Sequence, residues 1–493
     1  MRQLLLEFSY LDIRAALLEQ GTLVEFATED LREPALLPGD VFQARVVKVM
    51  PEISGAIVDL GSQHGILQTR RFPECEVART RTTLANGAKG WAYIPEKLRE
   101  GLSIFVQVRR LPRGGKLARV SPHIVIEGFF LALALGRRGV HSPWQISRET
   151  RADILGVLAN RGLREDGFEV HPRACFASTD ELVSEIERLE QTQHRLLQAL
   201  NGYSGPGLVY RAGDPVLRLF LAIGHPELTS ICVDGDESAL RRAKEAWLGL
   251  TRGRPTPFHR HQKPTPLFVE HRIDDQIEAA LASDVPIPGG GFVRFDLTDA
   301  ATVVDVNSGD KRLASHISSR SRRSLKSLNF DAARTILTQL RLRNCSGSII
   351  VDFVNAPENG SESSWFSVLK DLLRGDAAIT SYHVHRGCPL LHIQRRYRRP
   401  SLAELFLCKC PTCGSAAKRL NLETRLRNLL RETAHKLRTV PSARHAIIEA
   451  PRELFEYWLR SELDLVHALE AATSVNFEVR PAHSNQPSIR LVT

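Results

Sequence analysis

The chain has 493 residues, too many for one hydrophobic core, which predicts about three or four domains. Its hydrophobic fraction of 43% and charged fraction of 25% are ordinary for a globular protein, and the absence of a long apolar run argues against a transmembrane segment. Lysine and arginine (66) exceed aspartate and glutamate (56), giving a net charge of +10 that favours an anionic partner such as nucleic acid. The N-terminus lacks the features of a signal peptide, and the cysteines are scattered apart from Cys408, Cys410 and Cys413. This distribution predicts a cytoplasmic protein with reduced thiols and one possible metal site.

The N-terminal part is predicted to be rich in strands. Leu4–Phe8 and Leu23–Phe26 have the composition of strands, and Leu11–Glu19 between them is predicted to be a helix. After a turn at Pro38 and Gly39, three segments rich in valine and alanine predict a small closed β-barrel, although any β-rich module would fit the same pattern. These segments are Val41–Val49, Gly55–Leu60 and Gly101–Val108.

The middle of the chain alternates between helix and strand patterns. Thr179–Asn201 carries an apolar stripe among acids and glutamines and predicts an amphipathic helix. Leu208–Tyr210 and Ser230–Val233 are predicted to be buried strands, with a helix over Glu237–Leu248. The basic, proline-containing segment Arg252–Pro266 is predicted to be a flexible connector.

The C-terminal half contains the most informative strands. Phe292–Leu297 and Thr302–Val306 predict two neighbouring strands, and Ser348–Phe353 predicts a short, fully buried one. Asn329 is predicted to cap a helix, and Asn421–Pro481 alternates helix, strand, helix, strand as a small α/β unit. The apolar stripe of the helix after Asn329 consists of Phe330, Ala333, Leu337 and Leu340.

Two carboxylates interrupt the apolar strands. Asp305 lies in VVDVN and Asp352 ends IIVD, and an acid in such a run is costly unless its charge is compensated. If the two strand ends lie side by side in one sheet, the carboxylates would converge on a hard cation such as Mg²⁺. Asn307, on the same face as Asp305, could orient a water or a phosphate. The alternative is that each aspartate merely ends a strand or caps a turn.

The densest basic stretch of the chain lies between these acids, and a second basic cluster surrounds Tyr397. A phosphodiester nuclease needs such cations, because they hold the nucleic-acid backbone while a metal activates water. For either cluster alone, a solvated surface run is an equally good interpretation. The residues are Arg320, Arg322, Arg323 and Lys326 in a serine-rich loop, Arg341 and Arg343 further on, and Arg395, Arg396, Arg398 and Arg399 around Tyr397.

The segment CPTCG at 410–414 has the form of a metal-binding knuckle. Cys410 and Cys413 would supply half of a tetrahedral zinc site, so further ligands must come from Cys408, from elsewhere in the chain or from a second copy. A redox-active pair or plain structural thiols are the alternatives.

Three segments together resemble the RNase E/G family of endoribonucleases. The segment 291–309, which reads GFVRFDLTDAATVVDVNSG, is similar to the core signature of that family. The segment 329–353, with QLRLR and VDF, is similar to the next block, and CPTCG stands where the family has its zinc-link. Because the chain lacks a long scaffold tail, it looks more like RNase G than full-length RNase E.

The resemblance implies a multidomain α/β protein in which an RNase H-like fold is split by an inserted S1 (OB-type) β-barrel. The remaining implied parts are a sensor region for RNA 5′ ends, a DNase I-like catalytic region, a zinc-link and a small α/β C-terminal domain. The implied boundaries are 1–37 and 206–277 for the RNase H-like parts, 38–122 for the S1 barrel, 123–205 for the 5′-sensor-like region, 278–399 for the catalytic region, 400–415 for the zinc-link and 416–493 for the C-terminal domain.

The implied activity is magnesium-dependent endonucleolytic cleavage of single-stranded RNA in RNA processing or turnover, including rRNA maturation. By position, Asp305 and Asp352 would ligate the catalytic Mg²⁺, and Asn307 would help to place it. Cys410 and Cys413 would be each chain's contribution to a Zn²⁺ shared between protomers of a dimer or tetramer. The alternative is an RNA-binding protein on the same scaffold that is catalytically weak or inactive.

The resemblance also marks residues that would contact RNA, with some departures from the family pattern. Isoleucines at 57 and 66 stand where the family has aromatic residues in the barrel, and Lys116 matches a basic barrel residue. In the sensor region, Arg173 is the candidate for contacting a 5′-monophosphate. Because Pro172 has neither a hydroxyl nor a backbone N–H, weak discrimination between RNA 5′ ends is predicted.

Overall fold

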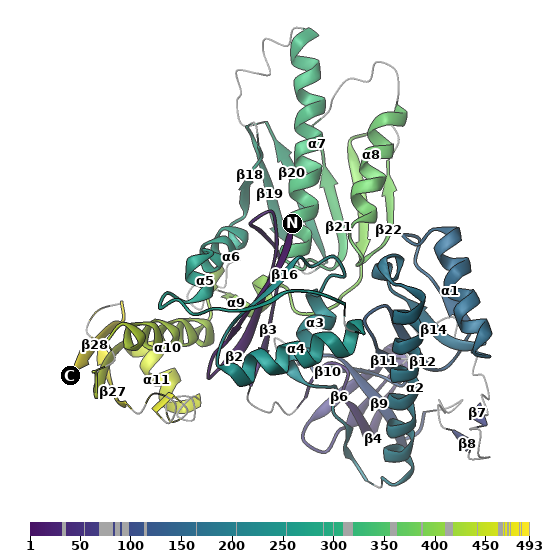
Figure 1. Cartoon of the computed structure of the whole chain (residues 1–493), viewed down its shortest axis with the longest axis horizontal. Coiled ribbons are helices and arrows are strands. Elements are labelled where there is room, and N and C mark those ends of the chain that lie inside the picture. The colour runs from purple at the N-terminus through teal and green to yellow at the C-terminus, as the bar shows by residue number, and fades with distance from the viewer. Residues whose placement is uncertain are drawn as a thin grey trace.

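The structure is a computed structural model, and its sheets and helices form several packed α/β units (Figure 1). In the part of the chain that the structure describes, no helix has both the length and the apolar composition needed to cross a membrane. The described residues are all except 32–35, 54, 69–81, 84–88, 91–97, 113–115, 164, 204, 253, 289, 299, 309–318, 355–361, 386–387, 410–417, 441, 462–466, 468, 471–472, 474, 483, 485 and 493.

The first sheet joins two distant parts of the chain. Three antiparallel N-terminal strands continue, through a parallel pairing, into two strands from beyond residue 229, in the order β17-β16-β1-β2-β3. Helices α3 and α4 pack on one face of this sheet, and α5 and α6 pack on the other. The elements are β1 (Arg2–Phe8), β2 (Asp12–Glu19), β3 (Thr22–Asp30), β16 (Ser230–Asp234), β17 (Phe258–Arg260), α3 (Pro215–Ile223), α4 (Glu237–Thr251), α5 (Leu267–Glu270) and α6 (Ile273–Leu281).

The predicted β-barrel is confirmed. Five strands pair in the order β4-β5-β6-β10-β9, and a further pairing of β4 with β9 closes the ring around a core that includes Val46, Val58 and Val106. The strands are β4 (Val41–Met50), β5 (Gly55–Asp59), β6 (His64–Gln68), β9 (Ser103–Arg110) and β10 (Ala118–Ser121). Beside them lie η1 (Pro51–Ile53), the pair β7 (Thr82–Thr83) and β8 (Lys89–Gly90), and β15 (Gly207–Tyr210), which extends the sheet from β4.

A four-stranded sheet with two helices follows the barrel. The long helix α2 has the predicted bounds and begins with a capping box, in which Ser178 and Glu181 each satisfy a backbone N–H of the first turn. Its apolar side, with Ile186 and Leu189, packs against this sheet. The elements are β11 (Val125–Glu127), β12 (Leu131–Arg138), β13 (Val140–His141), β14 (Asp166–Val170), α1 (Arg148–Asn160), η2 (Pro172–Phe176) and α2 (Thr179–Asn201).

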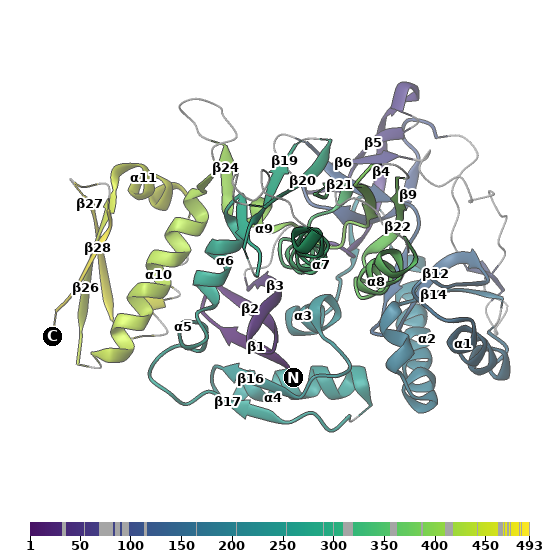
Figure 2. The same cartoon turned by 90° about the horizontal axis from the view of Figure 1, so that it is seen from above.

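A six-stranded sheet carries the two predicted carboxylates, and its strand order is β18-β19-β20-β21-β23-β22. Helices α7 and α8 cover one face (Figures 1 and 2), where Ile336 and Leu340 pack against Val304 and Ile349. We call the opposite face, which carries Val303, Asp305, Ile350 and Asp352, the open face. The elements are β18 (Asp284–Pro286), β19 (Phe292–Leu297), β20 (Ala301–Asn307), β21 (Gly347–Asp352), β22 (Ile379–Val384), β23 (Leu390–Arg395), α7 (Ser319–Leu342) and α8 (Glu362–Arg374).

The C-terminal part is a small α/β unit, as the sequence predicts. Its sheet has the order β27-β26-β28, and α10 and α11 pack against it. A short helix and a hairpin connect it to the six-stranded sheet. The elements are α9 (Leu402–Phe406), β24 (Leu407–Lys409), β25 (Lys418–Leu420), α10 (Leu422–Thr439), β26 (His445–Pro451), α11 (Arg452–Ser461), β27 (Asn476–Ala482) and β28 (Ser488–Val492).

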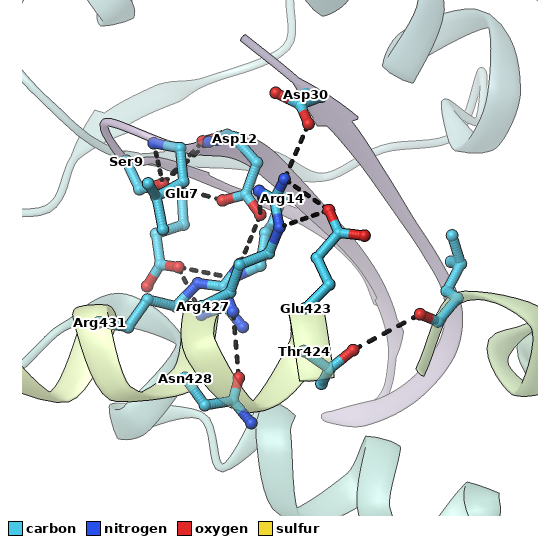
Figure 3. A network of polar contacts seen from close by, with 12 residues as sticks. Glu7, Ser9, Asp12, Arg14, Asp30, Glu423, Thr424, Arg427, Asn428 and Arg431 are labelled. Atoms are coloured by element: carbon cyan, nitrogen blue, oxygen red, sulfur yellow. Dashed lines mark hydrogen bonds and ion pairs between the residues drawn. The ribbon is translucent and has the colours of Figure 1, made fainter. Parts of the chain in front are cut away.

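A buried ionic network fastens α10 to the N-terminal sheet (Figure 3). Arg427 donates to Asp30 at 2.8 Å, and both Arg427 and Arg431 form ion pairs with Asp12, which is 3% exposed. Next to it, Arg14 donates to Glu7 at 2.8 Å. These charges lie in low-dielectric surroundings, so their pairing fixes how the C-terminal unit sits against β2 and β3.

The prediction of a helix at Leu11–Glu19 is wrong, because this segment forms β2. The strand lies between β1 and β3, and all but its last residue are buried. A strand that is buried on both faces loses the alternation of apolar and polar residues, so its sequence cannot be distinguished from that of a buried helix. The predicted connector Arg252–Pro266 likewise contains β17, a short parallel edge strand.

Two further expectations for the six-stranded sheet need correction. Asn329 does not cap a helix, because α7 already begins at Ser319; its side-chain amide donates to the backbone carbonyl of Val354 at 2.8 Å. The region expected to be a serine-rich loop is therefore helical from Ser319 onward. Strand β21 is not fully buried, since Ile349 and Val351 are 0% exposed but Ile350 is 37% exposed.

Candidate active site

The two candidate carboxylates lie side by side at the ends of neighbouring strands. Strands β20 and β21 are parallel, and Asp305 is the direct register partner of Asp352. Both side chains are exposed on the open face, whereas Val304 and Val351 beside them are 0% exposed and point into the core. The geometry expected from the two sequence patterns is thus present.

Asn307 holds one of these acids in place. Its side-chain Nδ2 donates to Oδ2 of Asp305 at 2.7 Å, which fixes the orientation of that carboxylate. The backbone here is tightly packed, because a Cβ on Gly291 would lie 2.4 Å from the carbonyl oxygen of Asn307. Gly291 also has a φ of +82°, so both close approach and conformation require glycine at this position.

Neither carboxylate of the pair forms an ion pair within the described residues, and Arg294 contributes only a longer-range attraction to Asp305. Arg294, the register partner of Asp305 on β19, instead forms a two-pronged ion pair with Asp284 at 2.7 and 2.8 Å. Two adjacent carboxylates without a counter-ion repel each other unless a cation binds between them. Exposed oxygen ligands in this arrangement fit Mg²⁺, which keeps several waters and needs only one or two carboxylates.

Two arginines that were predicted to contact RNA are structural, and this part of the prediction is wrong. The side chain of Arg341 pairs with Glu19 and Glu25 of the N-terminal sheet. Arg343 is 5% exposed, stacks over the ring of Phe295 and donates to the backbone carbonyl of Ala282 at 2.8 Å. Both guanidiniums are therefore committed to contacts within the protein, and not to a ligand on the surface.

The structure describes only some of the other residues that were predicted to contact RNA. Lys116 is exposed just before β10, as a surface contact would require. In the barrel, the two isoleucines that replace aromatic residues, Ile57 and Ile66, are direct partners on β5 and β6. The side chains of Arg320, Arg322, Arg323 and Lys326, on the first turns of α7, lie outside the described part of the structure.

Arg173, the candidate contact for an RNA 5′ end, is half-buried, and its guanidinium is engaged by other parts of the protein. It lies on the 3₁₀ segment η2 rather than in a strand, and it donates to the carbonyls of Leu221 at 2.6 Å and Gly224 at 3.1 Å. Its guanidinium also lies 4.5 Å from the ring centre of Phe129. Burial, together with Arg398, lowers its pKa to about 9, which is the behaviour of an interior cation.

A cleft of about 1590 Å³ lies between the barrel, the four-stranded sheet and the base of the six-stranded sheet. We call it the arginine cleft because Arg109, Arg110, Arg137, Arg396 and Arg398 line it. Arg110 stacks on Tyr397, which also lines the cleft, with 3.7 Å between its guanidinium carbon and the ring centre.

The lining of the arginine cleft has more arginines than carboxylates, although Glu127 and Glu169 also line it and Arg137 pairs with Glu169 at 2.5 Å. Burial, with Arg109 and Arg137 adding to it, lowers the pKa of His123 to about 4. Of the predicted cluster around Tyr397, Arg396 and Arg398 are exposed, while Arg395 pairs with Asp376 and Arg399 with Glu25 in the interior. Sequence reasoning missed Arg109, Arg110 and Arg137, although the arginine pair that ends the apolar strand β9 was a usable signal.

Of the predicted zinc ligands, Cys410 and Cys413 lie outside the described residues. Cys408 is exposed on β24, and its thiol donates to the carbonyl of Arg419 at 3.5 Å. Strands β24 and β25 pair through Lys409 and Lys418, so the two ends of the segment that contains both cysteines are adjacent.

The fold and the site define a multidomain α/β protein with an exposed carboxylate pair on one sheet and a cation-lined cleft at the base of that sheet. The model of the Ribonuclease E/G family matches residues 136–398, more than half of the chain, and the chain belongs to this family.

Individual relatives cover most of this chain. Ribonuclease E of Escherichia coli K12 is 26% identical over 471 residues, which are 93% of this chain and 42% of that protein. Ribonuclease E of a Nostoc species is 27% identical over 85% of this chain and 61% of its own length. Ribonuclease G of Haemophilus influenzae is 25% identical over 93% of this chain and 92% of its own length. The chain thus spans about half the length of the Ribonuclease E relatives and nearly all of this Ribonuclease G.

Proposed function

We propose that this protein is an endoribonuclease that cleaves single-stranded RNA with Mg²⁺ held by Asp305 and Asp352. The observation that carries the proposal is the direct register of these acids on parallel strands, where both are exposed and neither forms an ion pair with a described residue. Membership of the Ribonuclease E/G family supports the choice of RNA as substrate. Cleavage would break the bond from phosphorus to the 3′ oxygen and leave a 5′-phosphate on the downstream fragment.

The residues of the chain have separate roles in this reaction. Asp305 and Asp352 would hold the cation, and Asn307 fixes the orientation of the Asp305 carboxylate through the 2.7 Å hydrogen bond. When bound, Mg²⁺ lowers the pKa of a water and stabilises charge on the phosphate.

We further propose that the RNA backbone follows the arginine cleft, which opens at the end of β21 opposite the acids. Arg396 and Arg398 are exposed there, and Lys116 on the barrel, together with the basic residues Arg320, Arg322, Arg323 and Lys326 of α7, would add phosphate contacts. Because phosphate contacts release counter-ions, affinity should fall steeply with salt. Because the Arg173 guanidinium already donates to the backbone carbonyls of Leu221 and Gly224, selectivity for an RNA 5′ end should be weak.

Cys410 and Cys413 are proposed to bind Zn²⁺ shared between two protomers of a dimer or tetramer. The paired ends of β24 and β25, which hold the two ends of the intervening segment together, support a knuckle there. In the alternative form of the site, the exposed Cys408 is an additional ligand. Metal analysis distinguishes the two forms, because a shared site requires about half a zinc per chain and a Cys408-containing site about one.

The test is cleavage of an unstructured oligoribonucleotide with and without Mg²⁺, using Asp305→Asn and Asp352→Asn. Both substitutions keep the side-chain shape but remove a charged ligand, so cleavage should fall by about a hundredfold or more while RNA binding persists. Asp296→Asn is the matched control, because Asp296 is exposed on the same face but pairs in register with Val303. Cleavage that survives in both variants would exclude this metal site, and binding without any cleavage by the wild type would identify an RNA-binding protein instead.

A further inference from the structure

The open face continues from the carboxylates toward the arginine cleft. Val303 and Ile350 lie two residues before the acids on β20 and β21, about 7 Å from them, and are register partners. On the other side of β21, Ile350 pairs in register with His392 of β23. One step further, Ser348 faces Gln394, which lines the arginine cleft together with Gly347. An RNA strand running from the cleft to the acids would therefore pass over these residues.

Val303 and Ile350 are apolar side chains left in contact with solvent. They are 36% and 37% exposed, while their neighbours Val304, Ile349 and Val351 are all 0% exposed. Their position directly beside two acids is unusual for a solvated strand face, where polar side chains are expected. A small exposed apolar surface next to the proposed phosphate site suits the flat face of a nucleobase.

Ser348 and His392 form a polar pair next to these two apolar side chains. Ser348 Oγ lies 2.6 Å from Nε2 of His392. The second ring nitrogen has no hydrogen-bond partner among the residues that the structure describes. Whichever tautomer is present, the pair offers one further donor or acceptor. A ribose 2′-hydroxyl, which both donates and accepts, can satisfy either state.

We propose that Val303, Ile350, Ser348 and His392 form a nucleoside subsite that holds the nucleotide next to the scissile phosphate and reads its 2′-hydroxyl. The apolar pair contacts the nucleoside, and the serine–histidine pair hydrogen-bonds the sugar. This inference rests on the proposed function, because it assumes that RNA reaches Asp305 and Asp352 along the open face.

The first experiment replaces one ribose at a time by 2′-deoxyribose in an oligoribonucleotide with one cleavage site. At one position beside the cut, kcat/KM of the wild type should fall about three- to tenfold, the size of one hydrogen bond. In Ser348→Ala and His392→Phe, the ribose and deoxyribose versions should be cleaved at nearly equal rates. Ser348→Thr, which keeps the hydroxyl, should restore the difference.

Ser381→Ala is the matched control, because Ser381 is exposed on neighbouring β22 as the partner of Gln394 and should leave the difference unchanged. A 2′-deoxy effect that is equal in wild type, Ser348→Ala and His392→Phe would overturn the inference.

Binding separates this inference from the proposed chemistry. The affinity of Asp352→Asn for the same ribose and deoxyribose oligonucleotides should show the same discrimination without cleavage. If the wild type discriminates in binding but does not cleave, the catalytic proposal is wrong and the subsite is supported. If the wild type cleaves but neither its binding nor its cleavage discriminates, the subsite is wrong and the catalytic proposal is supported.

The apolar pair is tested with Val303→Thr and Ile350→Thr, which keep β-branched side chains suited to a strand. Each should raise KM for the oligoribonucleotide several-fold at nearly unchanged kcat. If these variants instead change the sedimenting mass of the protein and leave KM unchanged, the face is an interface with a second copy and the nucleoside subsite is wrong.

Discussion

Two pairs of carboxylates in this protein share one backbone geometry and differ in everything around them. Glu7 and Asp234 are register partners on the parallel strands β1 and β16, just as Asp305 and Asp352 are on β20 and β21. The first pair is buried, at 7% and 4% exposure, whereas the second is exposed on the open face.

The difference lies in the charges that surround each pair. Arg14 donates to Glu7 at 2.8 Å, and Asp234 accepts from the backbone N–H of Leu267 at 2.9 Å with Arg438 at 3.5 Å. No described residue provides a cation in this way for Asp305 or Asp352. A carboxylate pair that the protein neutralises with its own arginines is part of the fold, and one that it leaves unneutralised is available to a metal ion.

The largest expected effect is on stability at the buried pair. Glu7→Ala leaves the Arg14 guanidinium buried without its main partner, so the free energy of unfolding should drop by about 3–5 kcal/mol. Asp352→Ala removes an exposed charge and should change it by no more than about 0.5 kcal/mol. Urea denaturation compares the two variants, with Glu227→Ala as the control for the half-exposed ion pair between Glu227 and Arg2. An equal loss of unfolding free energy in Glu7→Ala and Asp352→Ala would show that the two carboxylate pairs do not differ in their role in the fold.

A second prediction uses the metal itself. If Mg²⁺ binds the folded protein at Asp305 and Asp352, a concentration ten times Kd should stabilise it by about 1.4 kcal/mol. Thermal unfolding should show this gain in the wild type and in Glu7→Gln, and no gain in Asp305→Asn or Asp352→Asn. A gain that persists in both aspartate variants and disappears in Glu7→Gln would reverse the assignment.

A third prediction concerns a histidine among arginines, where the unbalanced charge is positive. Burial, then Arg2, Arg341 and Arg173, lowers the pKa of His225 to about 3. Because the unfolded state takes up this proton first, stability from His225 is full above about pH 6.5 and is lost as pH falls toward 3.

The measurable quantity is the pH dependence of the difference between wild type and His225→Asn. The wild type should lose up to about 1.4 kcal/mol per pH unit more than the variant between pH 6.5 and 3. Parallel profiles for the two proteins would show that His225 is not held neutral by its surroundings.

The sequence by itself determined the features that depend on local periodicity and composition. The alternation in Thr302–Val306 and the acid that ends the apolar run at Asp352 located two strands and their carboxylates. Ser178 and Glu181 start α2 at its observed position, and the valine-rich segments identify a closed barrel. These features could be predicted because the side chains that decide them are close together in the chain.

Only the tertiary structure decided which charges stay exposed and which hold the fold together. Arg341 and Arg343 belong to the richest basic stretch, yet Glu25 and Phe295, remote in sequence, commit them to the interior. Burial raises the pKa of Glu25, but the neighbouring Arg341 and Arg399 outweigh this effect and lower that pKa to about 2. Arg109 and Arg396 lie far apart in the chain but line one cleft. The free energy of a charge depends on burial and on neighbours within a few ångströms, and folding, rather than sequence distance, selects those neighbours.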